Sequence, residues 1–132
     1  MAMFRISQAA ELVGVSDDTI RRHIEHGHLS VQTDASNRKV VDGYELARFI
    51  QDQANPASDR TGVNSSARNR LVGLVTAVTK DKVMAQVEIQ CGPHRFVSLI
   101  SSEAVEDLGL EPGVLAVASV KSTNVTVETP KA

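Results

Sequence analysis

Residues 66–69 read Ser66-Ala67-Arg68-Asn69 and stand where a polar stretch ends and a segment rich in β-branched residues begins. They supply a hydroxyl, a permanently charged guanidinium and several backbone N–H groups, which are the hydrogen-bond donors that an oxyanion needs. A similar stretch, Lys121-Ser122-Thr123-Asn124, lies near the far end of the same half of the chain. We therefore expect this half to fold so that both stretches meet around one small anion.

Strand signals fill the chain between these two stretches. In residues 83–90 apolar side chains recur at every second position and alternate with Met84, Gln86, Glu88 and Gln90, which is the period of a half-buried strand. The other predicted strands cover residues 71–79, 95–100, 115–120 and 125–128. A short helix, capped by Ser101 or Ser102 and stopped at Gly109, is expected among them. About five short strands are enough for a small closed barrel of the oligonucleotide- and oligosaccharide-binding type.

The first half has a different pattern, which predicts two short helices joined by a tight turn. Ser7 is expected to cap a helix over residues 7–13, and Ser16 to cap a second over residues 17–24, because serine accepts the unpaired N–H groups that open a helix. Gly14 gives the backbone the freedom for the turn between them. This is the arrangement of helix-turn-helix DNA readers, whose second helix enters the major groove.

A hairpin and a third helix are predicted after the second helix. Two short runs within residues 29–41 flank a polar tip, and this candidate wing would place Arg38 and Lys39 against a phosphate backbone. Asp42 is expected to cap the third helix, residues 43–53. The side chains expected to contact DNA are Ser16, Thr19, Arg21, Arg22, Arg38 and Lys39.

The two halves are separated by residues 54–64, which contain Pro, Gly and small polar residues without an apolar period and are predicted to be a linker. The predicted fold is therefore α+β in two domains. Residues 1–53 form a small winged helix-turn-helix domain, and residues 65–132 form the five-stranded barrel. The alternative for the first domain is a helical protein-interaction module whose arginines are only solvated.

Composition limits the function classes. The net charge is −2, and residues 1–53 carry six Lys/Arg and eight Asp/Glu, so DNA binding must depend on where the cations lie. The single Cys91 rules out an internal disulfide, and no signal peptide or membrane-spanning apolar run stands out, so we expect a cytoplasmic protein. The histidines at 26, 28 and 94 lack the companions of a metal site, and no catalytic constellation is recognised. We expect no enzyme.

Two segments resemble known families. Through Arg5-Ile6-Ser7, Val15-Ser16 and Ile20-Arg21-Arg22, residues 4–53 resemble the winged helix-turn-helix of the excisionase and mercury-regulator (MerR-like) group. The second resemblance rests on residues 66–69, 83–89, 108–113 and 120–125. Through these motifs, in this order and spacing, residues 65–129 resemble a molbindin (Mop-type) domain, the molybdate-binding member of the TOBE group.

The molbindin resemblance implies an oxyanion site. It implies that molybdate or tungstate is held by Ser66, Arg68, Ser101, Lys121 and Ser122. Ala104 stands where relatives often place a further hydroxyl and so removes one possible donor. In the family such pockets form between subunits, which implies a homo-oligomer, from dimer to hexamer, in which each copy supplies part of a site.

These features together predict a molybdate- or tungstate-responsive transcription regulator. Anion binding by the barrels would bias the arrangement of the attached helix-turn-helix domains and so change their affinity for double-stranded DNA. One alternative is a storage or buffering protein for the same anions whose first domain only mediates protein contacts. Another is an architectural DNA-binding protein whose barrel serves only for assembly.

Overall fold

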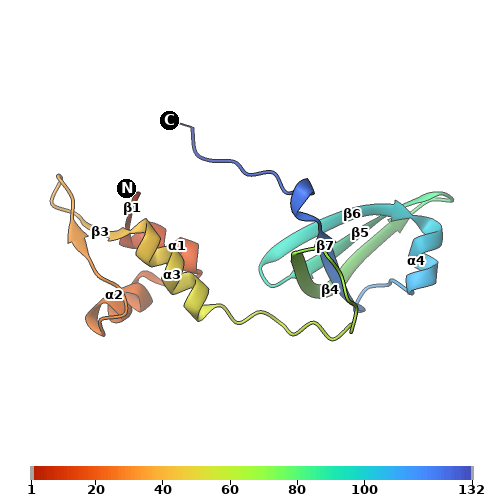
Figure 1. The fold of residues 1–132 in the computed structure, drawn as a ribbon, viewed down its shortest axis with the longest axis horizontal. Helices are drawn as coiled ribbons and strands as arrows, with labels where there is room; N and C mark the ends of the chain where they lie inside the picture. The colour runs from red at the N-terminus through yellow and green to blue at the C-terminus, as the bar shows by residue number, and fades with distance from the viewer. Residues whose placement is uncertain (1, 132) are drawn as a thin grey trace. The chain divides into compact units, whose positions relative to one another are not determined.

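The computed structural model describes residues 2–131 and divides into two compact units, Met1–Asn55 and Pro56–Ala132 (Figure 1). Both units mix helices with antiparallel strands. Within residues 2–131, no helix has the length and apolar character needed to cross a bilayer.

The N-terminal unit packs three helices with a small sheet. Its elements are β1 (Met3–Arg5), α1 (Ile6–Val13), α2 (Asp17–Glu25), β2 (Gln32–Thr33), β3 (Lys39–Asp42) and α3 (Gly43–Gln53). The strands form an antiparallel sheet in the order β1-β3-β2, so the predicted hairpin is joined by a short N-terminal strand that the sequence did not predict. Buried apolar side chains from all three helices, from β3 and from the segment before β2 hold the unit together. The largest of those that are almost completely buried are Ile20, Leu29, Val41 and Leu46.

Local hydrogen bonds set the helix ends. Ser16 Oγ accepts a hydrogen bond from the Thr19 N–H at 3.2 Å, and Asp42 Oδ2 accepts one from the Glu45 N–H at 3.0 Å, as predicted for the caps of α2 and α3. The prediction for α1 was wrong. Its N-cap is Arg5 rather than Ser7, because the Gln8 side chain reaches back and accepts the Arg5 N–H at 3.0 Å.

The C-terminal unit is a four-stranded antiparallel sheet with one helix. Its elements are β4 (Asn69–Lys80), β5 (Met84–Cys91), β6 (His94–Ser101), α4 (Ser102–Leu108), β7 (Leu115–Val120) and the short 3-10 helix η1 (Ser122–Asn124). The strand order is β6-β5-β4-β7. Ser101 caps α4 and Gly109 ends it in the left-handed conformation, as predicted.

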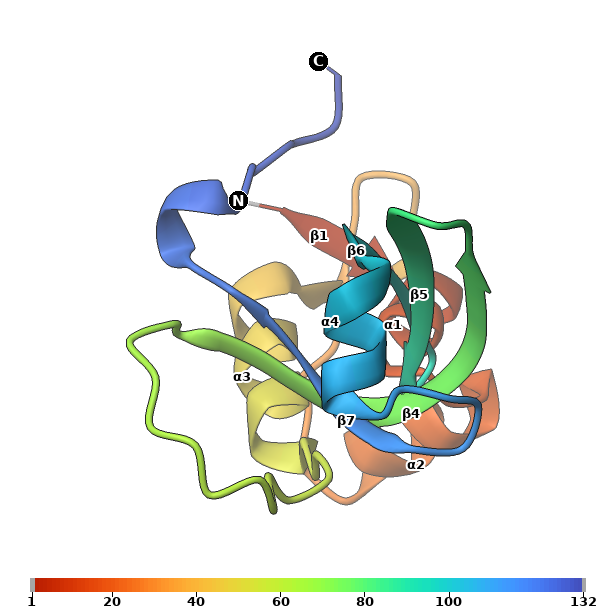
Figure 2. The ribbon, with the colours of Figure 1, turned by 90° about the vertical axis from the view of Figure 1, so that its right-hand side faces the viewer.

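The sheet curls because β4 pairs with β7 along its first part and with β5 along its second part. Figure 2 shows the strong curvature of this sheet. Residues 69–74 pair with β7, residues 74–80 pair with β5, and an irregularity in the ladder lies between Val75 and Ala77. Gly73 allows the close approach, because a Cβ there would overlap the Gln90 carbonyl and lie 2.7 Å from Cys91 Sγ. The core enclosed by this curl consists mainly of Val75, Ala85, Val87, Ile89 and Val105.

Four strands are present in this unit instead of the five expected. Residues 125–128 lie outside the sheet, and Val127 is 83% exposed. An alternating segment becomes a strand only when a sheet edge supplies its hydrogen bonds, and within one chain η1 leads these residues away from β7. Between β6 and β7 a hollow of about 410 Å³ remains, lined largely by apolar side chains such as Ile100 and Leu115.

Candidate oxyanion-binding site

The ladder between β4 and β7 brings the two predicted donor stretches together. Asn69 pairs with Val120 in this ladder, so Arg68, one residue before, and Lys121, one residue after, flank the same end of the sheet. The Asn69 side chain strengthens the junction by donating a hydrogen bond from Nδ2 to the Val120 carbonyl at 3.1 Å. Two segments more than fifty residues apart in sequence therefore meet at one edge, as the sequence predicted.

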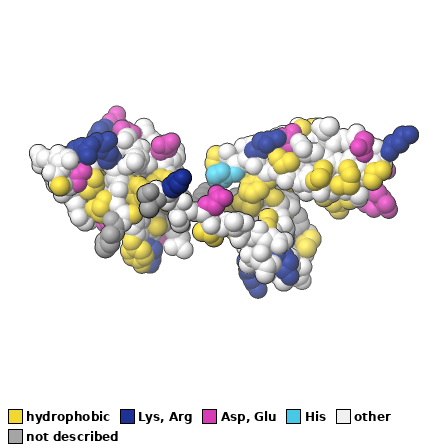
Figure 3. Space-filling view, turned by 90° about the horizontal axis from the view of Figure 1, so that it is seen from above, with side chains coloured by type: hydrophobic (Ala, Val, Ile, Leu, Met, Phe, Trp, Pro, Cys, Tyr) yellow, Lys and Arg dark blue, Asp and Glu magenta, His cyan; other side chains and the backbone are white. Residues whose placement is uncertain are grey.

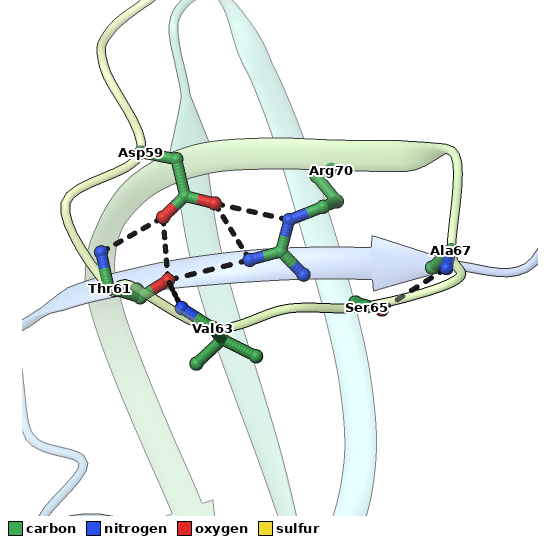
Figure 4. A network of polar contacts seen from close by, with 6 residues as sticks. All are labelled: Asp59, Thr61, Val63, Ser65, Ala67 and Arg70. Carbon is green, nitrogen blue, oxygen red and sulfur yellow. Dashed lines mark hydrogen bonds and ion pairs between the residues drawn. The ribbon is translucent and has the colours of Figure 1, made fainter.

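The first stretch presents its polar side chains to solvent because Ala67 anchors it. Ala67 is only 8% exposed, and its N–H donates to Ser65 Oγ at 3.1 Å (Figure 4). The neighbouring Ser66 and Arg68 are exposed, as expected when a chain alternates between inward and outward positions. Their hydroxyl and guanidinium groups are therefore free to bind a ligand at this end of the sheet.

The second stretch turns sharply after β7. Lys121 precedes η1, and its carbonyl accepts the Asn124 N–H at 2.9 Å. No side chain caps η1, and Lys121 and Ser122 are exposed. Of the ion pairs formed within residues 2–131, none involves Lys121 or Arg68. Both cations thus stand at one edge without an ion-pair partner among the described residues, which favours an anionic ligand.

A third segment, from the predicted linker, also lies against this end of β4. Arg70 donates to Asp59 Oδ2 from Nε at 3.1 Å and from Nη2 at 2.7 Å, and Thr61 donates its N–H and hydroxyl to Asp59 Oδ1 (Figure 4). The hydrogen bonds from Thr61, followed by those from Arg70, lower the pKa of Asp59 to about 2. The Asp59 charge is therefore compensated locally, which limits its repulsion of an anion near Arg68.

Ser101 does not join the other predicted ligands. It pairs with Met84 in the β5–β6 ladder, next to the Ala85–Lys80 pair, and so lies at the opposite end of β4 from Arg68. The length of β4 corresponds to about 35 Å along the strand. The Ser101 hydroxyl accepts the Ala104 N–H at 3.1 Å. One chain therefore assembles four of the five predicted ligands, and Ser101 can reach an anion at that site only from another copy.

The predicted DNA-contact residues lie on α2 and on the β2–β3 hairpin. Thr19 Oγ1 lies 3.0 Å from Ser16 Oγ and accepts a hydrogen bond from Arg22 Nη2 at 3.2 Å. Arg21 pairs with Asp18, and Arg38 pairs with Asp34 in the hairpin turn. All of these cations are exposed, as is Lys39.

Among residues 2–131, no three His, Cys, Asp or Glu side chains are placed to hold a metal ion. Cys91 is buried, its thiol donates to the Leu71 carbonyl at 3.5 Å, and burial raises its pKa. A neutral buried thiol is a poor nucleophile.

Sequence reasoning missed Asp59, Thr61, Asn69 and Arg70 as parts of this end of the sheet. Asp59 and Thr61 fall in a stretch whose composition is typical of a flexible linker, so nothing local marked them as structured. Asn69 and Arg70 stood inside or beside the motif, but only the folded structure shows that their side chains contact Val120 and Asp59.

Comparison with known proteins identifies the second unit. The TOBE domain family matches residues 65–127. Molybdenum-pterin-binding protein 3 of Clostridium pasteurianum is 43% identical over 63 residues, which cover 47% of this chain and 93% of that protein. Molybdenum-pterin-binding protein 2 of the same organism is 41% identical over the same lengths. The chain belongs to the TOBE family.

The TOBE domain also resembles a solved structure. The cytoplasmic molybdate-binding protein ModG, with molybdate bound, is 35% identical and superposes with a TM-score of 0.51, over 58% of this chain and 55% of ModG. The domain is thus of the molbindin type, as the motifs around residues 66–69 and 120–125 indicated. The N-terminal unit precedes the region that the family matches.

Proposed function

We propose that this protein is a molybdate-responsive DNA-binding regulator, in which the TOBE domain binds the oxyanion and the N-terminal unit binds DNA. The observation that carries the proposal is the meeting of Ser66 and Arg68 with Lys121 and Ser122 at one end of the β4–β7 ladder. The relatives named for molybdenum pterin or molybdate support the same ligand chemistry.

The donor set suits a tetrahedral dianion. Such an ion offers only hydrogen-bond acceptors, so a site of hydroxyl, guanidinium and ammonium donors favours it over cations. Tungstate has the same charge and nearly the same size as molybdate, and we include it as a ligand. Sulfate is smaller, and a site with fixed walls discriminates against it by leaving some donors unpaired.

Self-association completes the proposed site. Ser101 sits at the opposite end of the domain from Arg68, so both contact one anion only if neighbouring copies share the site. The TOBE domain also exposes apolar side chains, some of them visible in Figure 3, that a partner copy can cover. They include Leu74, Val97, Leu99, Leu115, Val125 and Val127. We therefore propose a homo-oligomer held together partly by its ligand.

The N-terminal unit supports a DNA-binding role. Helices α1 and α2 are joined through Gly14 in the left-handed conformation, and the β2–β3 hairpin extends beside α2. These features support our proposal that the unit acts as a winged helix-turn-helix, in which α2 would be the recognition helix. We place the protein in the cytoplasm, where it meets DNA, and propose that it binds its ligand without chemical turnover.

The test combines two measurements on the full chain. Calorimetric titration with molybdate, tungstate and sulfate is expected to show tight binding of the first two and weak binding of sulfate. Duplexes selected from a random library are expected to bind with an affinity that molybdate changes. An absence of heat with molybdate and tungstate would refute the ligand assignment, and an absence of sequence-selective duplex binding, with and without anion, would refute the regulator.

A storage protein is the second candidate, and the charge of the N-terminal unit favours it. Residues 1–53 carry two more acidic than basic side chains, which opposes non-specific DNA affinity. In that case the oligomer binds several anions and does not bind DNA. The duplex selection above separates the two functions directly.

A further inference from the structure

The N-terminal unit contains a basic hollow that the predicted DNA contacts only partly describe. It has a volume of about 420 Å³ and lies where the start of α1, the exposed side of α2 and the β2–β3 hairpin come together. Its polar lining consists of Arg5, Ser7, Asp17, Arg21, Arg38 and Lys39. Figure 3 shows Lys and Arg side chains gathered on this unit. We refer to this feature as the basic hollow.

From this feature we propose that the basic hollow is a binding site for a phosphodiester group of the DNA backbone, and that Arg5 and Arg21 belong to it. The inference rests on the proposed DNA-binding function and divides the residues of that interface into two groups. The basic hollow positions the protein on the phosphate backbone of the DNA. The other side of α2 contacts the base edges.

Charge and hydrogen-bonding capacity support a phosphate ligand. Four cationic side chains line the basic hollow against one carboxylate, that of Asp17. Arg21 and Arg38 have acidic partners, but Asp18 is largely exposed and the Arg38–Asp34 contact is long, at 3.5 Å. In the part of the chain from 2 to 131, no ion pair involves Arg5 or Lys39. A phosphodiester offers charged acceptor oxygens that match these donors and the Ser7 hydroxyl.

The main chain of the protein holds these donor side chains close together even when no ligand is bound. Arg5 is paired with Val40 in the β1–β3 ladder, so its backbone lies close to that of Lys39, the residue before Val40. Val40 and Val41 are buried, and Ile20 anchors α2 to the same core. The site is therefore built on three elements that share one core, so little of it has to be ordered when a phosphate binds.

Arg21 and Arg22 then have different partners although they are adjacent. Successive residues on a helix point about 100° apart. Arg21 lines the basic hollow, whereas Arg22 donates to Thr19, which in turn contacts Ser16. Contacts to phosphates fix register without reporting sequence, and contacts to base edges carry specificity. We therefore propose that Arg21 and Arg5 contact the DNA phosphates, and that Thr19 and Arg22 contact the bases.

The experiment measures duplex affinity against salt concentration for the full chain, using a random-sequence duplex and duplexes selected by the wild type. Arg5→Gln and Lys39→Gln are expected to weaken both kinds of duplex by the same factor and to reduce the slope of log K against log salt by about 0.9 for each lost phosphate contact. Arg22→Gln is expected to lower the preference for selected over random duplexes. Arg48→Gln, on α3 beside Tyr44, is the charge-matched control and should behave as wild type.

The results separate this inference from the proposed function. If the wild type binds no duplex, both fail. If the wild type binds but Arg5→Gln and Lys39→Gln leave affinity and slope unchanged while both variants unfold at the wild-type temperature, only the assignment of the basic hollow is overturned. A change in sequence preference in Arg5→Gln would likewise overturn it, because a backbone contact cannot cause one. If the wild type binds inorganic phosphate at constant ionic strength, Arg5→Gln does not, and neither protein binds a duplex, the basic hollow is a site for a free anion instead.

Discussion

Arg70 and Asp59 form the least exposed ion pair of the described chain, with side chains 21% and 32% exposed, and Arg70 donates two hydrogen bonds to the same carboxylate oxygen. The pair ties a segment with linker-like composition to β4, two residues after Arg68. The chain that leads to the N-terminal unit is therefore attached directly beside the candidate anion site, and the freely moving part of the linker is shorter than its composition suggests.

Breaking this pair should release the segment around Arg60. Trypsin cleaves after arginine, and a segment held by Asp59 and Thr61 resists cleavage because a protease needs an extended, mobile substrate. Limited trypsin digestion of Arg70→Gln is expected to cut after Arg60 several times faster than in the wild type. Arg95→Gln, which removes a surface pair with Glu88, serves as the control. Equal cleavage rates in all three proteins would show that the pair does not restrain the segment.

The Asp59 carboxyl should titrate far below an ordinary aspartate. NMR titration of this carboxyl is expected to give a pKa of about 2, and Thr61→Val should raise it, since Thr61 supplies the largest part of the shift. Because the pKa is lower in the folded state, the stabilisation is present above about pH 4, the unfolded pKa, and is lost as pH falls through about 2. A wild-type midpoint near 4 would contradict the network of Figure 4.

Arg68→Ala should weaken anion binding without unfolding the domain. The exposed guanidinium makes no ion pair within the described residues, so its removal costs no structure. Loss of one charged hydrogen bond of about 1.5 to 3 kcal/mol predicts a Kd for molybdate higher by about tenfold to about 150-fold. Calorimetry on Arg68→Ala and on the control Lys82→Ala, which lies in the β4–β5 turn, provides the measurement. Equal affinities for the two variants would remove Arg68 from the site.

Substitutions at Ser101 test whether neighbouring copies share the anion site. They distinguish its role as the cap of α4 from a contact with the anion. Ser101→Asp preserves a capping oxygen for α4, so the thermal stability should stay close to that of the wild type. If a neighbouring copy uses this hydroxyl for the anion, the new carboxylate repels the dianion and molybdate affinity falls steeply. Ser101→Ala should instead lose about 1 kcal/mol of stability from the cap. Wild-type molybdate affinity in Ser101→Asp would show that Ser101 acts only as a cap.

Gly73→Ala should destabilise the TOBE domain strongly. The added methyl group would overlap the Gln90 carbonyl, a backbone atom that cannot rotate away. We expect a loss on the order of 3 kcal/mol for this overpacked contact. In denaturant unfolding, the transition of the N-terminal unit should stay in place and serves as an internal control. An unchanged TOBE transition would mean that β4 and β5 separate there at little cost.

Local sequence was enough to predict the elements with strong periodicity and clear caps. Ser16 and Asp42 accept the N–H groups of the residues three further on, and α4 ends at Gly109, because capping depends on a few neighbouring atoms. The alternation around Val87 similarly predicted β5. The Ser7 cap failed because Gln8, also close in sequence, competes for the same role at the start of α1.

Only the tertiary structure decided which distant residues share an end of the sheet. The sequence predicted that the stretches of Arg68 and Lys121 meet, and the ladder register supplies the pairing that brings them together. The same register put Ser101 a strand length away, which spacing along the chain does not reveal. The attachment of Asp59 to Arg70 was equally hidden, since the composition of residues 54–64 describes a chain without partners. The predicted strand over residues 125–128 failed for the same reason. An alternating pattern specifies which face of a segment can be buried, but the segment becomes a strand only where a neighbouring strand edge is available to pair with it.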